Sequence, residues 1–210
     1  MKKRGAYTLA EVLITLGIIG VVAALTIPML VQNYKKQEVS AKLKKFYSVM
    51  MQAYNYAELE QGISMENWEF NQDLSVSNLK RAEIYYNTFF NNKYFNVLSV
   101  KQGVHPSDAR AVLEVVFADG SILYLWGGSA MDILYDVNGK KGPNKDGRDC
   151  FKFMHYPNRR LQPYVIEGGS VDSVNTRERA LNICKKFSTE CVPLLMFDNW
   201  EFKKDYPYRI

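Results

Sequence analysis

Residues 5–31 read GAYTLAEVLITLGIIGVVAALTIPMLV, and no charged residue follows Glu11 within this stretch. An α-helix rises about 1.5 Å per residue, so residues 12–31 span roughly the 30 Å hydrocarbon core of a bilayer. The sequence therefore predicts a membrane-spanning helix near the N-terminus. Lys2, Lys3 and Arg4 precede this helix. Such a basic cluster predicts that the N-terminus stays in the cytoplasm and that the chain after residue 31 lies outside.

The order of small and apolar residues separates this segment from a secretory signal peptide. A signal peptide has its small-residue cleavage site after the apolar run, whereas here Gly5 and Ala6 come before it. With the following residues 7–11, YTLAE, this arrangement resembles the class III signal of type IV prepilins and type II secretion pseudopilins. The resemblance is specific over the N-terminal segment and much looser beyond it.

The resemblance implies a defined processing site. In that family a prepilin peptidase cuts on the cytoplasmic side, ahead of an aromatic residue, and leaves a glutamate fifth in the mature chain. Counting back from Glu11 makes Tyr7 the first mature residue, with a methylated amine, and Ala6 the residue before the cut. Glycine is usual before the cut, so Ala6 is a departure. A cut after Gly5 would restore glycine but would move Glu11 to sixth, and we favour the cut between Ala6 and Tyr7.

Glu11 has a physical role that can be argued from the residues. A charged side chain at the centre of a bilayer costs on the order of 2.5–3.5 kcal/mol or more and persists mainly where it has a partner. No Lys, Arg or His lies between Glu11 and Lys35. Cleavage creates a new amine at Tyr7, but the helix keeps it about 6 Å from Glu11 along the axis. We therefore expect Glu11 to meet the amine of a neighbouring subunit and to drive self-assembly. The alternative is that Glu11 sits at headgroup level, where its charge suits the helix N-terminus.

Gly17, Gly20 and Pro28 interrupt the apolar run. The two glycines form a small face, and Pro28 removes a backbone hydrogen bond and is expected to kink or loosen the helix. The resemblance implies that Pro28 serves assembly. A simple kink in a membrane anchor fits the same residues.

Beyond the membrane the sequence predicts an α+β fold. Apolar residues recur at helical spacing from residue 32 to near Gly62, so the helix is expected to continue with one apolar face. A second helix is predicted over residues 78–92. Strands are predicted over residues 111–117, 121–126, 130–137 and 149–154, the first two joined by a hairpin at residues 118–120. A long helix followed by antiparallel strands indicates a helix laid across a sheet, as in pilins.

The expected organisation has four parts. Residues 1–6 are a leader peptide, 7–31 the membrane-spanning and polymerisation helix, 32–62 its amphipathic continuation, and 63–210 an extracytoplasmic α+β domain. The formal net charge is +5, and loss of the leader lowers it to about +2, too little for a dedicated nucleic-acid protein.

The cysteines lie in the part expected outside the cytoplasm, where disulfides persist. Cys184 and Cys191 bracket a short polar segment and are predicted to form a bridge, which would contribute roughly 2–3 kcal/mol. Cys150 is left over. It is either buried as a small apolar residue or free to pair between subunits.

Residues 136–149 form an Asp- and Gly-rich loop that resembles the calcium-binding loop of major pseudopilins. Asp136, Asn138 and Asp149 could supply side-chain oxygens to calcium. The same loop also contains Lys140, Lys141, Lys145 and Arg148. A turn stabilised by Asx hydrogen bonds, with no ion, is the alternative.

The sequence gives little support to an enzyme. His105 and His155 have no nucleophile or carboxylate at defined spacing, and two histidines alone are weak grounds for a zinc site. We therefore expect a non-enzymatic subunit of a type IV pilus or of a type II secretion pseudopilus. Its expected location is the cytoplasmic (inner) membrane and then the filament.

The resemblance also implies the partners of the chain, namely a prepilin peptidase, other pilin or pseudopilin subunits, a membrane assembly platform, an assembly ATPase and membrane lipid. The alternative function is a membrane-anchored minor pilin or binding module, whose basic loop at residues 140–148 would meet DNA or another polyanion.

Overall fold

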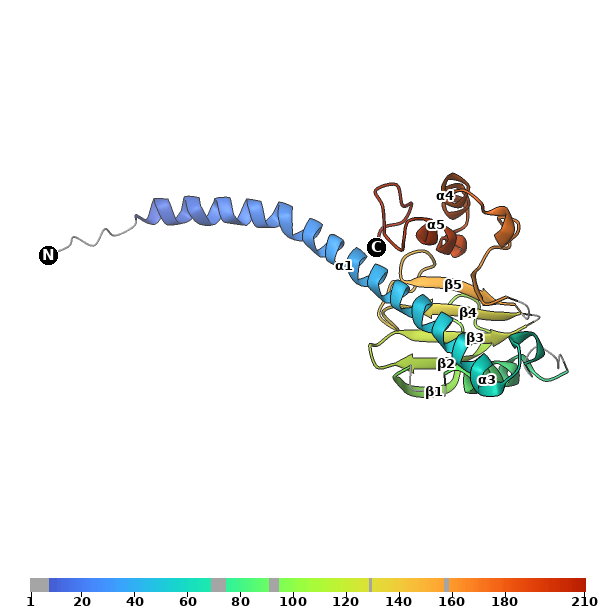
Figure 1. Cartoon of the computed structure of the whole chain (residues 1–210). Helices are drawn as coiled ribbons and strands as arrows, with labels where there is room; N and C mark the ends of the chain where they lie inside the picture. Colours follow the sequence, from blue (N-terminus) through green and yellow to red (C-terminus); the bar gives the residue numbers. More distant parts are fainter. Residues whose placement is uncertain (1–7, 69–74, 91–94, 129, 157–158) are drawn as a thin grey trace.

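A computed structural model describes residues 8–68, 75–90, 95–128, 130–156 and 159–210. Its dominant element is helix α1, Leu9–Gln61, which runs without a break through Pro28. Gly62 ends it with a left-handed backbone (φ 65°), a conformation that glycine adopts without steric cost. The N-terminal half of α1 projects away from the rest of the chain, and the helix bends as it approaches the domain (Figure 1).

The domain is built on a six-stranded antiparallel sheet in which each strand pairs with the next along the chain. The strands are β1 (Val97–Val104), β2 (Ala111–Phe117), β3 (Ile122–Gly127), β4 (Met131–Asp136), β5 (Cys150–His155) and β6 (Leu161–Pro163). The turn at residues 118–120 joins β2 to β3, as expected from the sequence.

One face of this sheet is covered by the C-terminal half of α1 and by α3, Asn78–Phe89, whose cap is Ser77. Buried positions of α1 begin only at Val39, because no other element of the described residues packs against the preceding part. Phe46 stacks on Tyr135 of β4 with ring centroids 4.2 Å apart. Close approach of α3 to β3 requires Gly127, since a Cβ there would lie 2.5 Å from the Cβ of Arg81.

The C-terminal region adds a helical layer beside β5. It contains η2 (Val171–Ser173), α4 (Arg177–Lys186), η3 (Ser188–Glu190) and α5 (Val192–Phe197). A short helix η1, Met65–Asn67, follows α1. The final segment returns to the sheet, where Trp200 and Tyr206 are buried and the Tyr206 hydroxyl donates a 2.7 Å hydrogen bond to the Gly147 carbonyl.

The predicted fold class is confirmed: a long N-terminal helix packs on an antiparallel sheet in a pilin-like α+β arrangement. The expected strands at residues 111–117, 121–126, 130–137 and 149–154 correspond to β2, β3, β4 and β5. The second helix ends at Phe89, three residues before the predicted end at residue 92, and residues 91 and 92 lie outside the described part. Strands β1 and β6 and helices α4 and α5 were not predicted from the sequence.

Candidate functional site

The N-terminal half of α1 presents an apolar surface that none of the described residues covers. An 18-residue window of this helix has a mean hydropathy of 2.4, and none of it is buried. Leu9 and Leu25 are 79% and 73% exposed, values far from those of core residues. The helix is long and apolar enough to cross a membrane, and together with the signal sequence it indicates membrane anchoring.

Glu11 caps the beginning of this helix. Its Oε2 accepts hydrogen bonds from the Thr8 backbone N–H at 2.8 Å and from the Thr8 hydroxyl at 2.9 Å. The Glu11 backbone N–H in turn donates to the Thr8 hydroxyl oxygen at 3.3 Å. This reciprocal pair is a capping box. Sequence reasoning missed the role of Thr8, although the T-x-x-E spacing carries the signal.

The capping contacts bear on the two roles considered for Glu11. They satisfy backbone donors within one chain and agree with the helix-terminus role, yet they leave the carboxylate exposed to a neighbouring subunit. The predicted cleavage site between Ala6 and Tyr7, and the amine of Tyr7, lie outside the described residues. Pairing of Glu11 with a second subunit therefore stays a prediction.

The small residues of the helix form open positions on its surface. An added Cβ at Gly17 or Gly20 would meet no atom within 4 Å. Pro28 lies in unbroken helix, so the structure shows no interruption there, and its effect on the backbone is the missing N–H donor. At Gly17 and Gly20 another helix can approach α1 closely without displacing any side chain of α1.

The three residues predicted to bind calcium do lie together in the loop between β4 and β5. Asn138 donates from its backbone N–H to Asp136 Oδ1 at 3.2 Å and from its side-chain amide to Asp149 Oδ2 at 3.3 Å. Asp149 also accepts the backbone N–H groups of Asn144 at 2.9 Å and Lys145 at 2.7 Å. Both oxygens of Asp149 are therefore already engaged in stabilising the turn.

Two oxygens of this loop are still compatible with a cation. Asp136 Oδ2 and Asn138 Oδ1 are buried without a hydrogen-bond partner of ordinary geometry, although the Cys150 thiol lies close enough to Asp136 to affect its pKa. Burial, with a smaller contribution from the charge of Asp149, raises the pKa of Asp136 to about 7. Within the described residues, no three His, Cys, Asp or Glu side chains gather closely enough to hold a metal. The geometry favours the Asx-stabilised turn, and calcium binding stays a prediction.

Calcium binding to this loop has a direct thermodynamic test. If Asp136 and Asn138 bind the ion, millimolar calcium raises the melting temperature of a fragment lacking residues 1–30, and a chelator lowers it, because ligand binding stabilises the folded state. Asp136→Ala abolishes the response. Asp172→Ala, at an exposed carboxylate outside the loop, leaves it intact. A wild-type fragment whose melting temperature ignores calcium identifies the loop as an ion-free turn.

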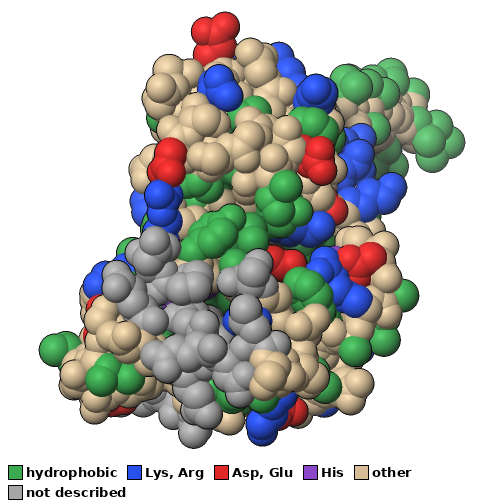
Figure 2. All heavy atoms as spheres, turned by 90° about the vertical axis from the view of Figure 1, so that its right-hand side faces the viewer, with side chains coloured by type: hydrophobic (Ala, Val, Ile, Leu, Met, Phe, Trp, Pro, Cys, Tyr) green, Lys and Arg blue, Asp and Glu red, His purple; other side chains and the backbone are tan. Residues whose placement is uncertain are grey.

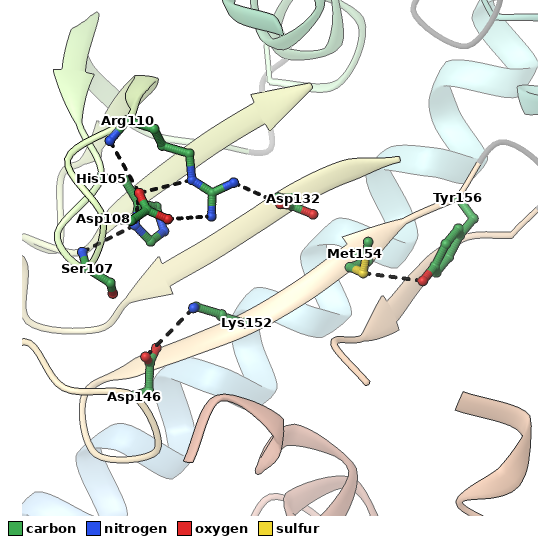
Figure 3. A network of polar contacts seen from close by, with 9 residues as sticks. All are labelled: His105, Ser107, Asp108, Arg110, Asp132, Asp146, Lys152, Met154 and Tyr156. Carbon is green, nitrogen blue, oxygen red and sulfur yellow. Dashed lines mark hydrogen bonds and ion pairs between the residues drawn. The ribbon is translucent and has the colours of Figure 1, made fainter. Parts of the chain in front are cut away.

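The two histidines occupy separate environments. Figure 3 shows His105 in a polar network, where its Nδ1 accepts the Ser107 backbone N–H at 3.2 Å and Arg110 bridges Asp108 and Asp132 at 2.9 and 3.3 Å. Burial lowers the pKa of His105 to about 4.

His155 lies among aromatic side chains on the other side of the sheet. Its ring centroid is 4.8 Å from that of Tyr54 and 5.8 Å from that of Phe89, and burial lowers its pKa to about 3. Both imidazoles are thus neutral near pH 7, and each belongs to a different structural cluster. This arrangement gives the enzyme interpretation no support.

The disulfide between Cys184 and Cys191 is present, as predicted. It ties the end of α4 to the residue before α5. Cys150 is free and buried in β5, in agreement with the first of its two interpretations. Burial, with a contribution from Asp136, raises the pKa of its thiol, which keeps it protonated.

Glu190 is a structural residue that no motif or spacing in the sequence singles out. Its buried carboxylate accepts three backbone N–H groups, from Ile166 at 3.0 Å, Glu167 at 2.6 Å and Gly168 at 2.9 Å. Since Cys191 follows directly, these bonds join the loop at residues 166–168 to the disulfide.

Comparison with known families bears on both parts of the chain. A model described as a family of unknown function (DUF6613) matches residues 29–210, and the prokaryotic N-terminal methylation motif matches residues 1–27. No curated protein and no solved structure matches the chain. The second match supports a type IV prepilin-like signal.

Proposed function

The chain belongs to a family of unknown function (DUF6613) and carries a prepilin-like methylation motif, and from these facts we propose that it is a structural subunit of a type IV pilus-like or pseudopilus filament. The observation that carries the proposal is the apolar half of α1, of which an 18-residue window has no buried residue and which has an acid at its start. A filament buries such a surface against other copies after the membrane has held it.

The proposal assigns a task to each part of the chain. Residues 1–6 are a leader removed by a prepilin peptidase, and residues 7–31 hold the subunit in the cytoplasmic membrane and later pack in the filament core. Residues 32–62 join this segment to the extracytoplasmic domain at residues 63–210. Burial of residues from Val39 onward supports the division between the free and the packed parts of the helix.

Assembly also requires partners that supply energy and a scaffold. The methylation motif implies processing by a prepilin peptidase, and we propose that a membrane platform and an assembly ATPase then move the subunit into a homo- or hetero-filament. Glu11 would meet the amine of Tyr7 on a neighbouring subunit, and Gly17, Gly20 and Pro28 would allow close packing of adjacent helices. A type II secretion role is one form of this proposal.

Cell fractionation tests the proposed function. In cells that contain the peptidase and the assembly machinery, the cleaved chain should appear in the filament fraction sheared from the surface or cross-linked at the membrane. Loss of the assembly ATPase should return it to the membrane fraction. A cleaved chain that never leaves the membrane fraction, with or without the ATPase, would instead favour a membrane-anchored binding module.

A further inference from the structure

The face of the domain that looks toward the apolar half of α1 is rich in basic side chains. Three segments meet there in Figure 1: the middle of α1, the loop between β4 and β5, and the C-terminal tail. Contacts join them, since Lys42 Nζ donates to the Val137 carbonyl at 2.7 Å and Lys44 Nζ to Asn199 Oδ1 at 3.5 Å. We call this face the basal surface. Its exposed or half-exposed cations include Lys35, Lys141, Arg148 and Arg209, and no carboxylate of the described residues forms an ion pair with them.

Cations elsewhere on the domain are mostly paired with acids. Lys80 pairs with Glu83, Arg160 with Glu58 and Arg159 with Asp172. Further pairs involve Lys101, Arg110, Lys152 and Arg177. Figure 2 shows the opposite end of the molecule, where basic and acidic side chains are interspersed. Arg179, Lys185 and Lys186 of α4 also form no ion pair among the described residues. Lys42 and Lys140, in contrast, pair with Glu38 and Glu114. What distinguishes the basal surface is that cations from three segments gather around one groove.

A groove of about 450 Å³ lies within the basal surface. Its cationic lining comes from Lys35 and Lys42 of α1, Lys141 and Arg148 of the loop, and Arg209 of the tail. Three acids also line the groove: Glu38 lies 3.4 Å from Lys42, Asp149 accepts backbone N–H groups, and Asp119 accepts the Ser121 hydroxyl at 2.6 Å. The hydrogen bonds leave the negative charges of Asp149 and Asp119 in place, so the five cations exceed the three side-chain acids by two. The C-terminal residue Ile210 also lines the groove, so its carboxylate offsets part of the charge.

The height of this surface above the membrane follows from the helix. Lys35 comes four residues after Val31 and Lys42 eleven, which places them about 6 and 17 Å beyond the apolar segment. The headgroup layer adds roughly 5–8 Å to each side of the hydrocarbon core, and the Debye length is about 8 Å at physiological ionic strength. Lys35, at one end of the groove, therefore lies at headgroup level, and Lys42 lies about 9–12 Å farther out, just beyond one Debye length.

We propose that the basal surface binds anionic phospholipid headgroups and thereby holds the domain against the outer leaflet before assembly. The inference rests on the proposed membrane anchoring through α1. Lipid is favoured over nucleic acid by position, because the groove is lined by Lys35 and Lys42 of α1, which follow the apolar half of the helix within a few turns. Attraction between clustered Lys or Arg and an anionic lipid surface needs no specific pocket and weakens with salt.

Hydrogen exchange on the full chain in lipid nanodiscs tests this proposal. In discs rich in phosphatidylglycerol, amides of residues 138–149 and 201–210 should exchange at least about tenfold more slowly than in phosphatidylcholine discs, while those of α4 should be unchanged. Raising the salt to about 1 M, where the Debye length is about 3 Å, should remove the difference. This measurement at high salt uses the wild-type chain, so it does not depend on whether any variant folds.

Charge reversal supplies the matched comparison. The triple variant K141E/R148E/R209E should lose the lipid-dependent protection, and the neutral K141Q/R148Q/R209Q should lose most of it. A control with the same change of net charge, K80E/R159E/R179E, alters exposed residues outside the basal surface and should keep it. If the wild-type chain is inserted in both kinds of disc and its loops exchange equally fast in both, the proposal is overturned. Membrane anchoring through α1 is then unaffected. Failure to insert into either disc counts against the anchoring itself.

Duplex DNA serves as the competing ligand. Added DNA should leave the protection in phosphatidylglycerol discs unchanged at moderate salt. Protection of the same loops by DNA in phosphatidylcholine discs, abolished by K141E/R148E/R209E, would assign the basal surface to nucleic acid and overturn the lipid assignment.

Discussion

Glu11→Gln is expected to be cleaved and inserted normally but to enter filaments at least about tenfold less than the wild type. Glutamine keeps a side-chain oxygen that can accept the Thr8 hydrogen bonds, so the helix start is preserved. What it removes is the negative charge that would meet a neighbour's amine in a medium of low dielectric. Removing one partner of a buried ion pair costs about 3–5 kcal/mol, which exceeds one factor of ten in an equilibrium constant. The measurement is the ratio of filament to membrane-bound protein.

Thr8→Val is the matched control for this experiment. Valine has a similar shape but removes the hydroxyl that completes the capping box, while the charge of Glu11 remains. Loss of a cap costs about 1 kcal/mol of helix stability, and it should leave filament incorporation much less affected. Equal incorporation of Glu11→Gln and wild type would rule out charge pairing. A defect in Thr8→Val as large as that in Glu11→Gln would assign Glu11 to capping alone.

Glu190→Gln is expected to destabilise the domain by about 3 kcal/mol, a large effect for one atom exchanged. The carboxylate accepts three backbone N–H groups in a buried position. An amide offers one oxygen and places an NH₂ group against donors. The wall of this site cannot adjust easily, since an added Cβ at Gly168 would already lie 2.8 Å from Glu190 Oε2.

Thermal unfolding of the detergent-solubilised chain measures this effect. A change of about 3 kcal/mol should lower the melting temperature by roughly 6–12 °C for a domain of this size. Glu178→Gln, on the exposed side of α4, should change it little. If Glu190→Gln has the same melting temperature as the wild type, the three N–H groups find other partners in the variant. The link between residues 166–168 and the disulfide then contributes little to the stability of the domain.

The predictable part of the fold is the part with strong periodicity. The apolar run and the stripe beginning at Val39 revealed α1, and Gly62 marked its end. Strands β2 and β3 are apolar and β-branched with a turn between them, so their pairing was evident. The amphipathic part of α1 is buried on one side and shows helical periodicity, whereas β2 and β3 are buried on both faces and appear as nearly continuous apolar runs.

The missed elements lack such a pattern. Strand β1 is an edge strand with exposed side chains on both faces, so no alternation distinguishes it. Strand β6 has only three residues, and α5 has six. Helix α4, RERALNICKK, is mostly charged, and its buried side depends on contacts with distant segments.

The residues of the candidate site, like the elements of the fold, were predictable from the sequence only in part. Glu11 could be identified because the residues around it form the prepilin-like pattern. The cysteine pair could be identified because only a short polar segment separates Cys184 from Cys191. The engagement of Asp149 by the N–H groups of Asn144 and Lys145 could not, because backbone donors leave no trace in residue identity. The basal surface could not be predicted from the sequence for another reason. Its cations come from three segments of the chain that only the fold brings together.

The N-terminus of the protein recovered from cells tests the central claim most directly. If the chain is a processed prepilin-like subunit, intact-mass analysis and N-terminal sequencing of the membrane or filament fraction will find Tyr7 first, with a methylated amine. Cells without the prepilin peptidase will instead retain the chain with its leader. Assembled protein that still begins at Met1, or that has been cut within residues 26–31, would contradict the account.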